Sequence, residues 1–427
     1  MSPLIRFTRR TFRSLRVRNY RLYFFSQIVS MTGTWAQSVA QIWLVLQLTG
    51  SGVALGIVTG LQFAPILLFG AWTGLLADRV DKRRLVMLTQ SAAMVLALVL
   101  GVITVAGVVE LWMIYALAFG LGIATAAEIP ARQSFVIEMV GEEDLVNAVG
   151  LNSAVFTSSR IVGPALAAVL ISTAGIEWCF FLNAGSFLAV ILALSRMEES
   201  ELQPVPRVPR SKGQIREGWR YVRSRPDLSL ALVLMAVVGT LAFNFRVILP
   251  LMATDVFGGG AGAYGMLSAI MAAGTVGGAL AAAAAGRADR RILLWSAVAF
   301  GALIMVAAAA PSLATEAVVL VPIGAVSMIF IATCNATLQL GSSDLMRGRV
   351  MALYAMLFLG TTPIGSPIVG WLAESVGVRA TFALTGIATL GAALAAWAWM
   401  GRAHSARRTA YATLGTSEVE APPRASV

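Results

Sequence analysis

Long apolar stretches alternate with short breaks along almost the whole chain, and the breaks contain charged residues, glycine or proline. A helix that crosses the hydrocarbon core of a bilayer needs about 20 predominantly apolar residues. The pattern therefore predicts an all-α membrane protein with twelve spanning helices. We expect these helices at residues 20–48, 52–77, 85–107, 111–131, 146–172, 176–195, 228–253, 263–285, 292–310, 316–339, 350–374 and 378–400.

One polar interruption is longer than the others and divides the predicted helices into two sets of six. It covers residues 196–227, is rich in proline and arginine, and separates a first bundle at 20–195 from a second at 228–400. We interpret it as a cytoplasmic linker. Its residues 214–225 are expected to form a short basic amphipathic helix on the membrane surface.

The distribution of arginine and lysine predicts the orientation in the membrane. Breaks on one side carry Arg79, Lys82, Arg83, Arg84, the linker arginines, Arg287, Arg290, Arg291, Arg347 and Arg349, whereas the opposite side carries only Arg379. By the positive-inside rule, the arginine-rich side is cytoplasmic. We therefore expect a protein of the bacterial plasma membrane with both termini in the cytoplasm: residues 1–19 as a basic segment and 401–427 as a disordered tail.

Composition narrows the possible functions. Hydrophobic residues make up 58% of the chain and charged residues 12%, against about 25% charged residues in soluble domains. The net charge of +11 does not indicate nucleic-acid binding, because the basic residues stand in short breaks rather than on a soluble face with stacking aromatics. Two isolated cysteines and one histidine in the tail predict no metal site, no cofactor and no enzyme.

The two halves of the sequence resemble each other weakly. The segment Gly74–Arg79 recurs as Gly286–Arg291, and Gly163-Pro164 of the fifth helix matches Gly365-Ser366-Pro367 of the eleventh. The offset is similar at each match. Two homologous six-helix halves of the same topology explain this best, and such parallel repeats place a binding site between the halves near the middle of the membrane.

Polar residues at a spacing of three or four form a stripe along the first helix: Gln27, Ser30, Thr34, Gln37 and Gln41. Lipid does not tolerate such a face, so we expect it to line a water-filled cavity, with hydrogen bonding between helices as the alternative. Shorter polar sets occur at Thr240 and Asn244 and at Asn335 and Gln339. All are candidates for the lining of a substrate path.

Ionisable residues inside predicted helices are functional candidates, because a charge is costly in hydrocarbon. Glu128 and Arg132 stand four residues apart and can pair on one helix face, as a static salt bridge or as part of the path. Arg160 and Arg246 are the other two candidates, with snorkelling to the interface as the alternative.

The break between the second and third helices carries the most specific motif. Gly74–Arg84 resembles the Gly-x-x-x-Asp-Arg-x-Gly-x-Arg-Arg loop of the major facilitator superfamily, with Asp81 where glycine is usual. The resemblance covers nearly all of the chain and implies two six-helix, pseudo-symmetric halves. It also implies that Asp78 packs against the cytoplasmic start of the eleventh helix, and that Gly74, Arg79 and Arg83 belong to the same conformational latch.

The fifth helix carries a second motif. Ser159–Ala168, which includes Arg160, Gly163 and Pro164, resembles the antiporter motif of the superfamily, with alanines at its last two glycine positions. Small residues allow close helix contact and proline introduces a bend. A coupling role and a merely close-packed helix pair are both open, and the association of this motif with exporters favours efflux.

Ile129–Ser134 and Arg18–Tyr23 resemble the subfamily that includes the enterobactin exporter, near which a lysophospholipid transporter also lies.

The two lysines, Lys82 and Lys212, do not form a phosphate-binding loop, which indicates no built-in ATPase. We therefore expect a monomeric, proton-coupled exporter of a hydrophobic or amphipathic small molecule, such as a drug or siderophore, with Glu128 as the leading proton site. A lysophospholipid flippase and a non-transporting scaffold are the alternatives.

Overall fold

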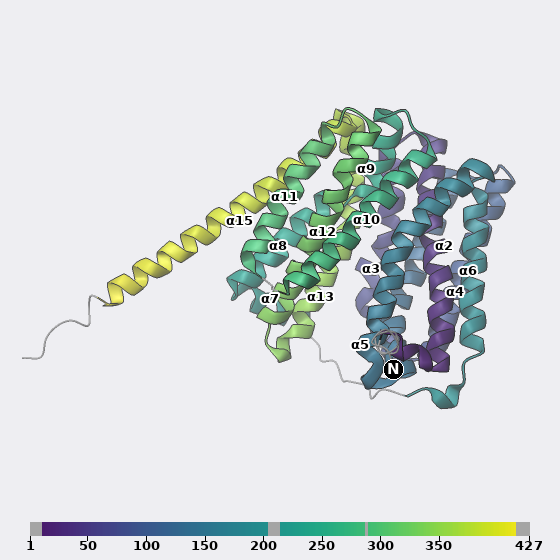
Figure 1. Cartoon of the computed structure of the whole chain (residues 1–427), viewed down its shortest axis with the longest axis horizontal. Helices are drawn as coiled ribbons and strands as arrows, with labels where there is room; N and C mark the ends of the chain where they lie inside the picture. The colour runs from purple at the N-terminus through teal and green to yellow at the C-terminus, as the bar shows by residue number, and fades with distance from the viewer. Residues whose placement is uncertain (1–10, 204–213, 287–288, 416–427) are drawn as a thin grey trace, which may run out of the picture.

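The computed structural model describes residues 11–203, 214–286 and 289–415, and the regular structure in these ranges is helical (Figure 1). Within these described ranges, ten helical segments are long and apolar enough to cross a membrane. Helix α2 (Arg18–Thr49) is not among these ten, because its polar residues lower its mean hydropathy. An all-helical membrane protein is thus confirmed.

The first half of the chain contains the 3-10 helix η1 (Arg13–Arg16), α2, α3 (Gly52–Arg79), α4 (Lys82–Val105), α5 (Leu111–Thr173) and α6 (Glu177–Ser195). Helix α5 consists of two helices that meet at Gly141, whose φ of 69° lies in the left-handed region that glycine adopts readily. Both predicted helices, 111–131 and 146–172, lie within α5, and the turn between them is tighter than the sequence indicates.

The second half follows the short η2 (Glu199–Glu201). It contains α7 (Gln214–Arg223), α8 (Pro226–Leu241), α9 (Phe245–Leu251), η3 (Met252–Val256), α10 (Ala261–Ala285), α11 (Arg290–Ala308), α12 (Leu313–Gly341), α13 (Asp344–Gly360), α14 (Thr362–Val376) and α15 (Val378–Gly415).

Two predicted helices are interrupted in the structure. The helix expected at 228–253 breaks between α8 and α9, where the Asn244 side chain donates to the Thr240 carbonyl at 2.7 Å. The helix expected at 350–374 divides at Thr361 into α13 and α14, just before Pro363, which lacks the backbone N–H that would continue the ladder. The last helix continues to Gly415, beyond the end expected near residue 400.

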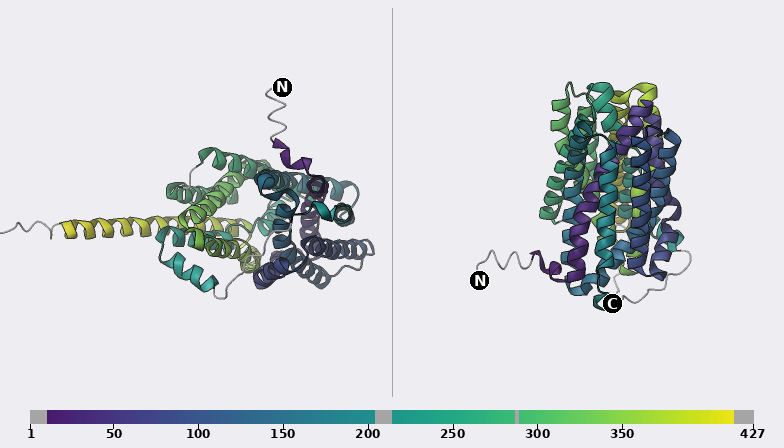
Figure 2. Two further views of the ribbon diagram at one scale, coloured as in Figure 1. Left: turned by 90° about the horizontal axis from the view of Figure 1, so that it is seen from below. Right: turned by 90° about the vertical axis from the view of Figure 1, so that its right-hand side faces the viewer.

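The helices form two neighbouring bundles, purple to teal for the first half and teal-green to yellow for the second (Figures 1 and 2). The bundles meet mainly along α3 with α14 and α5 with α10. The Pro164 carbonyl lies so close to α10 that a Cβ on Gly265 would be 2.8 Å from it. A Cβ on Gly56 of α3 would similarly collide with the Ser366 carbonyl of α14.

Corresponding glycines in the two halves make corresponding contacts. A Cβ on Gly163 would collide with Trp35 on α2, the first long helix of its own half. A Cβ on Gly365 would collide with the Thr240 carbonyl on α8, the first long helix of the second half. These paired contacts agree with the internal repeat seen in the sequence.

The linker helix α7 forms where the sequence indicates an amphipathic helix. It packs on α13, where Arg349 and Glu217 form an ion pair at 2.7 Å. The Tyr221 hydroxyl accepts the Ser343 N–H at 3.1 Å, and this hydrogen bond lowers the pKa of Tyr221. Trp219 is 44% exposed, as expected for a side chain at a membrane surface.

Candidate functional site

A cluster of two arginines, two aromatic residues and a glutamine lies where the bundles meet. Arg160 of α5 and Arg246 of α9 each place their guanidinium carbon 5.4 Å from the centre of the Trp35 ring. Arg246 also lies 5.4 Å from the Phe63 ring and donates to the Gln62 side-chain oxygen at 3.2 Å. We call Trp35, Gln62, Phe63, Arg160 and Arg246 the central cluster.

The central cluster joins the two halves, because Arg246 belongs to the second half and its partners belong to the first. Both arginines are half-buried. Each arginine–aromatic contact is worth about 0.5–2 kcal/mol, depending on how much water is excluded. Among the described residues, no carboxylate lies within 4.0 Å of either guanidinium group. The cluster therefore carries two positive charges that face neutral groups.

Sequence reasoning selected Arg160 and Arg246 but missed Trp35, Gln62 and Phe63, whose roles arise only when separate helices meet. Trp35 does stand out on α2, since it follows Gln27 and Met31 at intervals of four and shares their side of the helix. Arg132 approaches both of those residues, with its guanidinium nitrogen 3.5 Å from the Gln27 oxygen and 3.8 Å from the Met31 sulfur. One side of α2 thus meets three arginines.

The predicted ion pair is present: the Arg132 and Glu128 side chains approach to 3.8 Å between nitrogen and oxygen. Both side chains are partly exposed, by 27% and 14%. The pair lies between α5 and α2 inside the first bundle, and the buried Gln27 Nε2 beside it has no hydrogen-bond partner in the described part of the chain.

The rest of the polar stripe on α2 packs mostly inside the first bundle. The Gln37 oxygen accepts a hydrogen bond from Asn183 of α6 at 2.7 Å, and Thr34 lies 3.5 Å from the same residue. Gln41 is 4% exposed. Hydrogen bonding between helices, the alternative left open by the sequence, therefore accounts for Gln37 in this conformation.

The polar candidates of the second half have local roles. The Asn244 oxygen accepts from Ser366 of α14 at 2.8 Å while its amide closes the end of α8. Gln339 donates to Asn335 at 2.6 Å near the end of α12 and is exposed. Asn244 thus fixes a helix break close to Arg246, whereas the described hydrogen bond of the Gln339 side chain is to a residue of its own helix.

The loop motif joins elements of the first bundle. Arg83 donates to the Leu194 carbonyl at 2.8 Å and pairs with Glu199 at 2.7 Å, so its cation lies at the C-terminal end of α6. Arg79 is exposed and Gly74 is buried. The Asp78 side chain, on which the predicted latch depends, lies outside the described part of the chain.

The motif on the second half of α5 is a site of dense packing. Gly163 is buried against α2, where a Cβ would also lie 2.9 Å from the Thr32 carbonyl. Pro164 is buried against α10 of the other half. Close packing of this motif is therefore present, and the motif touches both its own bundle and the opposite one.

The two ends of the molecule differ in how the bundles are joined. At the end that contains Ser51, which we call the Glu374 end, the Glu374 carboxylate of α14 accepts from the Ser51 hydroxyl and from the Val53 N–H at 3.0 Å. This carboxylate sits at the N-terminus of α3, where negative charge is favourable. The sequence does not indicate this contact, because it joins α3 to α14 and neither segment alone carries a signal for it.

At the opposite end, which we call the Arg83 end, the described ion pairs stay within one half. Lys82 pairs with Glu138 and Arg83 with Glu199 in the first half, and Arg290 with Asp227 in the second. Helix η1 and α7 also lie at this end (Figure 1).

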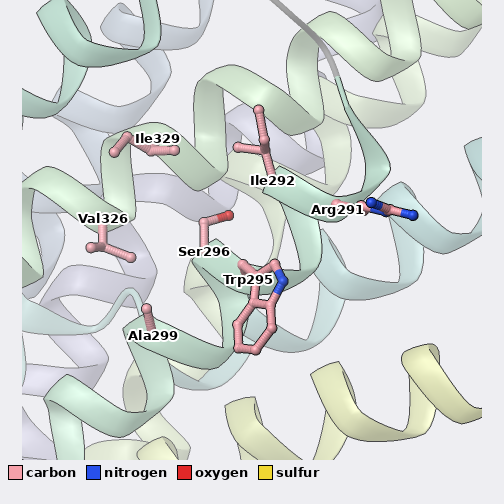
Figure 3. Close-up of a pocket in the computed structure, with 7 residues that line it drawn as sticks. All are labelled: Arg291, Ile292, Trp295, Ser296, Ala299, Val326 and Ile329. Atoms are coloured by element: carbon pink, nitrogen blue, oxygen red, sulfur yellow. The ribbon is translucent and has the colours of Figure 1, made fainter. Parts of the chain in front are cut away.

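A pocket of 330 Å³ lies elsewhere, on the side of α11 and α12 (Figure 3). Trp295 and Arg291 line it, and the Trp295 ring also contacts Trp397 of α15 with centres 5.1 Å apart. None of the central cluster lines this pocket.

Comparison with known proteins agrees with the architecture. The family model described as transmembrane secretion effector matches residues 9–420. The staphyloferrin A transporter of Staphylococcus aureus is 26% identical over 87% of this chain and 93% of its own length. Macrolide efflux protein A of Streptococcus pyogenes is 26% identical over 86% and 93%.

Among solved structures, a bacterial homologue of the human lysosomal transporter Spinster, in an inward-facing and occupied conformation, superposes with a TM-score of 0.69. It is 15% identical and the match covers 89% of this chain and 96% of that one, so the likeness concerns the fold. Since the family model spans nearly the whole chain, the protein belongs to the transmembrane secretion effector family of major facilitator superfamily transporters.

Proposed function

We propose that this protein exports a hydrophobic or amphipathic small molecule by alternating access and that protons drive the export. The observation that carries the proposal is the difference between the two ends of the molecule. The bundles are packed and hydrogen-bonded at the Glu374 end, whereas the described ion pairs at the Arg83 end stay within one half. A transporter closed on one side and ready to close on the other has this arrangement.

The proposed topology has twelve crossings, with α5 counted as two helices that meet at Gly141 and α2 added to the candidate spans. The arginine-rich Arg83 end is placed in the cytoplasm by the positive-inside rule, together with both termini. The Glu374 end then faces outward and is closed. We propose a monomer in the bacterial plasma membrane.

Protons supply sufficient energy for this proposal. One charge that crosses 100 mV releases about 2.3 kcal/mol, and tenfold accumulation of a solute costs about 1.4 kcal/mol. Glu128 remains the proposed proton site. Its place beside Arg132 supports a role in which protonation of the carboxylate releases the arginine.

The loop residues Gly74, Asp78, Arg79 and Arg83 are proposed to stabilise the state that is closed on the cytoplasmic side. Arg83 already joins α4 to the end of α6 in the first half, which supports movement of this half as one body. The similarity to the staphyloferrin A transporter and to macrolide efflux protein A supports a siderophore or a drug as the cargo.

Transport by the purified protein in liposomes tests the proposal. With an imposed pH gradient, we expect one member of a panel (a siderophore, a macrolide and a lysophospholipid) to accumulate against its own gradient, and an uncoupler to abolish the accumulation. Tracer counting after filtration measures the uptake, and protein-free liposomes provide the background. Accumulation that survives the uncoupler would contradict proton coupling, and selective movement of the lysophospholipid would instead favour a flippase.

A further inference from the structure

The central cluster contains two partly buried positive charges whose described partners are neutral. Arg160 contacts the Trp35 ring, and Arg246 contacts the Trp35 and Phe63 rings and the Gln62 oxygen. Both guanidinium carbons lie 5.4 Å from the centre of the Trp35 ring, so they are separated by at most twice that distance. Two like charges in a partly dehydrated place repel each other, and buried charges are ordinarily paired or neutralised.

Among the described side chains, no carboxylate pairs with Arg160 or Arg246 in this conformation. The Glu128 carboxylate is paired with Arg132 on its own helix, and Glu374 is hydrogen-bonded at the outer end of α3. No described anionic group therefore neutralises the two positive charges of the cluster, and a bound anion would do so.

We infer that the central cluster binds an organic anion, with the acidic group of the cargo held by Arg160 and Arg246 and its apolar part against Trp35. This inference rests on the proposed transport function and defines its substrate class. Guanidinium groups bind carboxylate and phosphate oxygens through paired, charge-assisted hydrogen bonds. An aromatic ring next to them provides the apolar surface that an amphipathic cargo requires.

The position of the two arginines relates anion binding to the transport cycle. Arg160 belongs to the first half and Arg246 to the second, so an anion held by both connects the halves. A cationic cargo in the same place would add a third positive charge. The cluster thus selects acidic molecules over cationic drugs of similar size and shape.

Equilibrium binding of one aromatic body in three charge states tests the inference. The probes are 2-naphthylacetate, its neutral methyl ester and 2-naphthylmethyl-trimethylammonium, measured by calorimetry on the full chain in lipid nanodiscs. We expect saturable binding of the anion, and affinities for the ester and the cation that are lower by at least about tenfold. Competition by 2-naphthyl phosphate and by lysophosphatidylglycerol shows whether the anion can come from a soluble acid or from a lipid headgroup.

Variants assign the binding to the cluster. Arg160→Gln and Arg246→Gln should each weaken anion binding by at least about tenfold, and Arg246→Lys, which keeps the charge, should weaken it less. Arg379→Gln is the matched control, because Arg379 also lies over an aromatic ring, Phe257, at 5.6 Å but near the outer end of the second half. Elution as a single monodisperse species checks that each variant folds.

The inference is wrong if the anion does not bind saturably, if it binds no better than its ester or the cation, or if both glutamine variants bind it as the parent does. These outcomes are separate from the transport test, because binding at equilibrium requires no proton gradient. Anion binding without proton-driven transport would leave the inference standing and overturn the proposed function. Proton-driven export of the cation without anion binding would support the proposed function and overturn the inference.

Discussion

Replacing Gly56 by valine is expected to lower transport by more than about tenfold while the protein still folds. A side chain at this position would meet the main chain of α14, at the Ser366 carbonyl and, at 2.7 Å, the Pro367 Cα. Main-chain atoms cannot rotate away, so α3 and α14 must separate. The state closed at the Glu374 end would then be lost, and with it the transport cycle.

The measurement combines tracer transport with labelling of a cysteine at Ala373 by a membrane-impermeant maleimide, because Ala373 is buried against Gly52 at the Glu374 end. We expect Gly56→Val to increase labelling of Ala373→Cys, and the native Cys179 and Cys334 give little background because both are buried. Gly277→Val is the control, since a Cβ at Gly277 meets nothing within 4 Å and the residue is exposed. Wild-type transport and labelling in Gly56→Val would mean that the contact between α3 and α14 does not close the outer end.

Replacing Gly163 by valine is expected to lower the melting temperature and to remove binding at the central cluster. The new Cβ would collide with Trp35 and lie 3.1 Å from the Ala36 nitrogen, so α2 must move away from α5. Forced overpacking of this kind costs about 1–3 kcal/mol. Because Trp35 carries both arginine contacts, its displacement should also disturb the positions of Arg160 and Arg246.

Thermal unfolding followed by tryptophan fluorescence measures the first effect, and calorimetry with 2-naphthylacetate measures the second. Gly150→Val provides the control on the same helix, because a Cβ at Gly150 meets nothing within 4 Å. If Gly163→Val has the melting temperature of the parent and binds 2-naphthylacetate equally well, the packing of this motif against α2 does not position the central cluster.

The sequence predicted most helices because each crossing requires its own apolar stretch, and the breaks at Gly50, Gly286 and Gly377 are visible as turn residues with positive φ. It did not predict the interruptions at Asn244 and Thr361. Those breaks depend on contacts such as the Asn244–Ser366 hydrogen bond, which joins segments that are distant in the chain.

The candidate site was predictable only in part. Periodicity identified a polar face on α2, but it does not say what that face meets, and Gln37 turned out to bond to Asn183 of α6. The presence of a charged residue in an apolar helix identified Arg160 and Arg246 as separate candidates, but not as members of one site. Their common contact with Trp35 arises from the packing of three separate helices, which leaves no local signal in the sequence.

In the proposed transport cycle, the two bundles alternate between closure at the Glu374 end and closure at the Arg83 end. Distances between spin-label pairs measure this directly: Leu48 with Val376 at the Glu374 end, and Arg84 with Gly348 at the Arg83 end, in a protein with Cys179 and Cys334 replaced by alanine. On acidification in nanodiscs, we predict a second population in which the Leu48–Val376 distance lengthens and the Arg84–Gly348 distance shortens. Distances that stay fixed at both ends, or that lengthen together, would contradict alternating access.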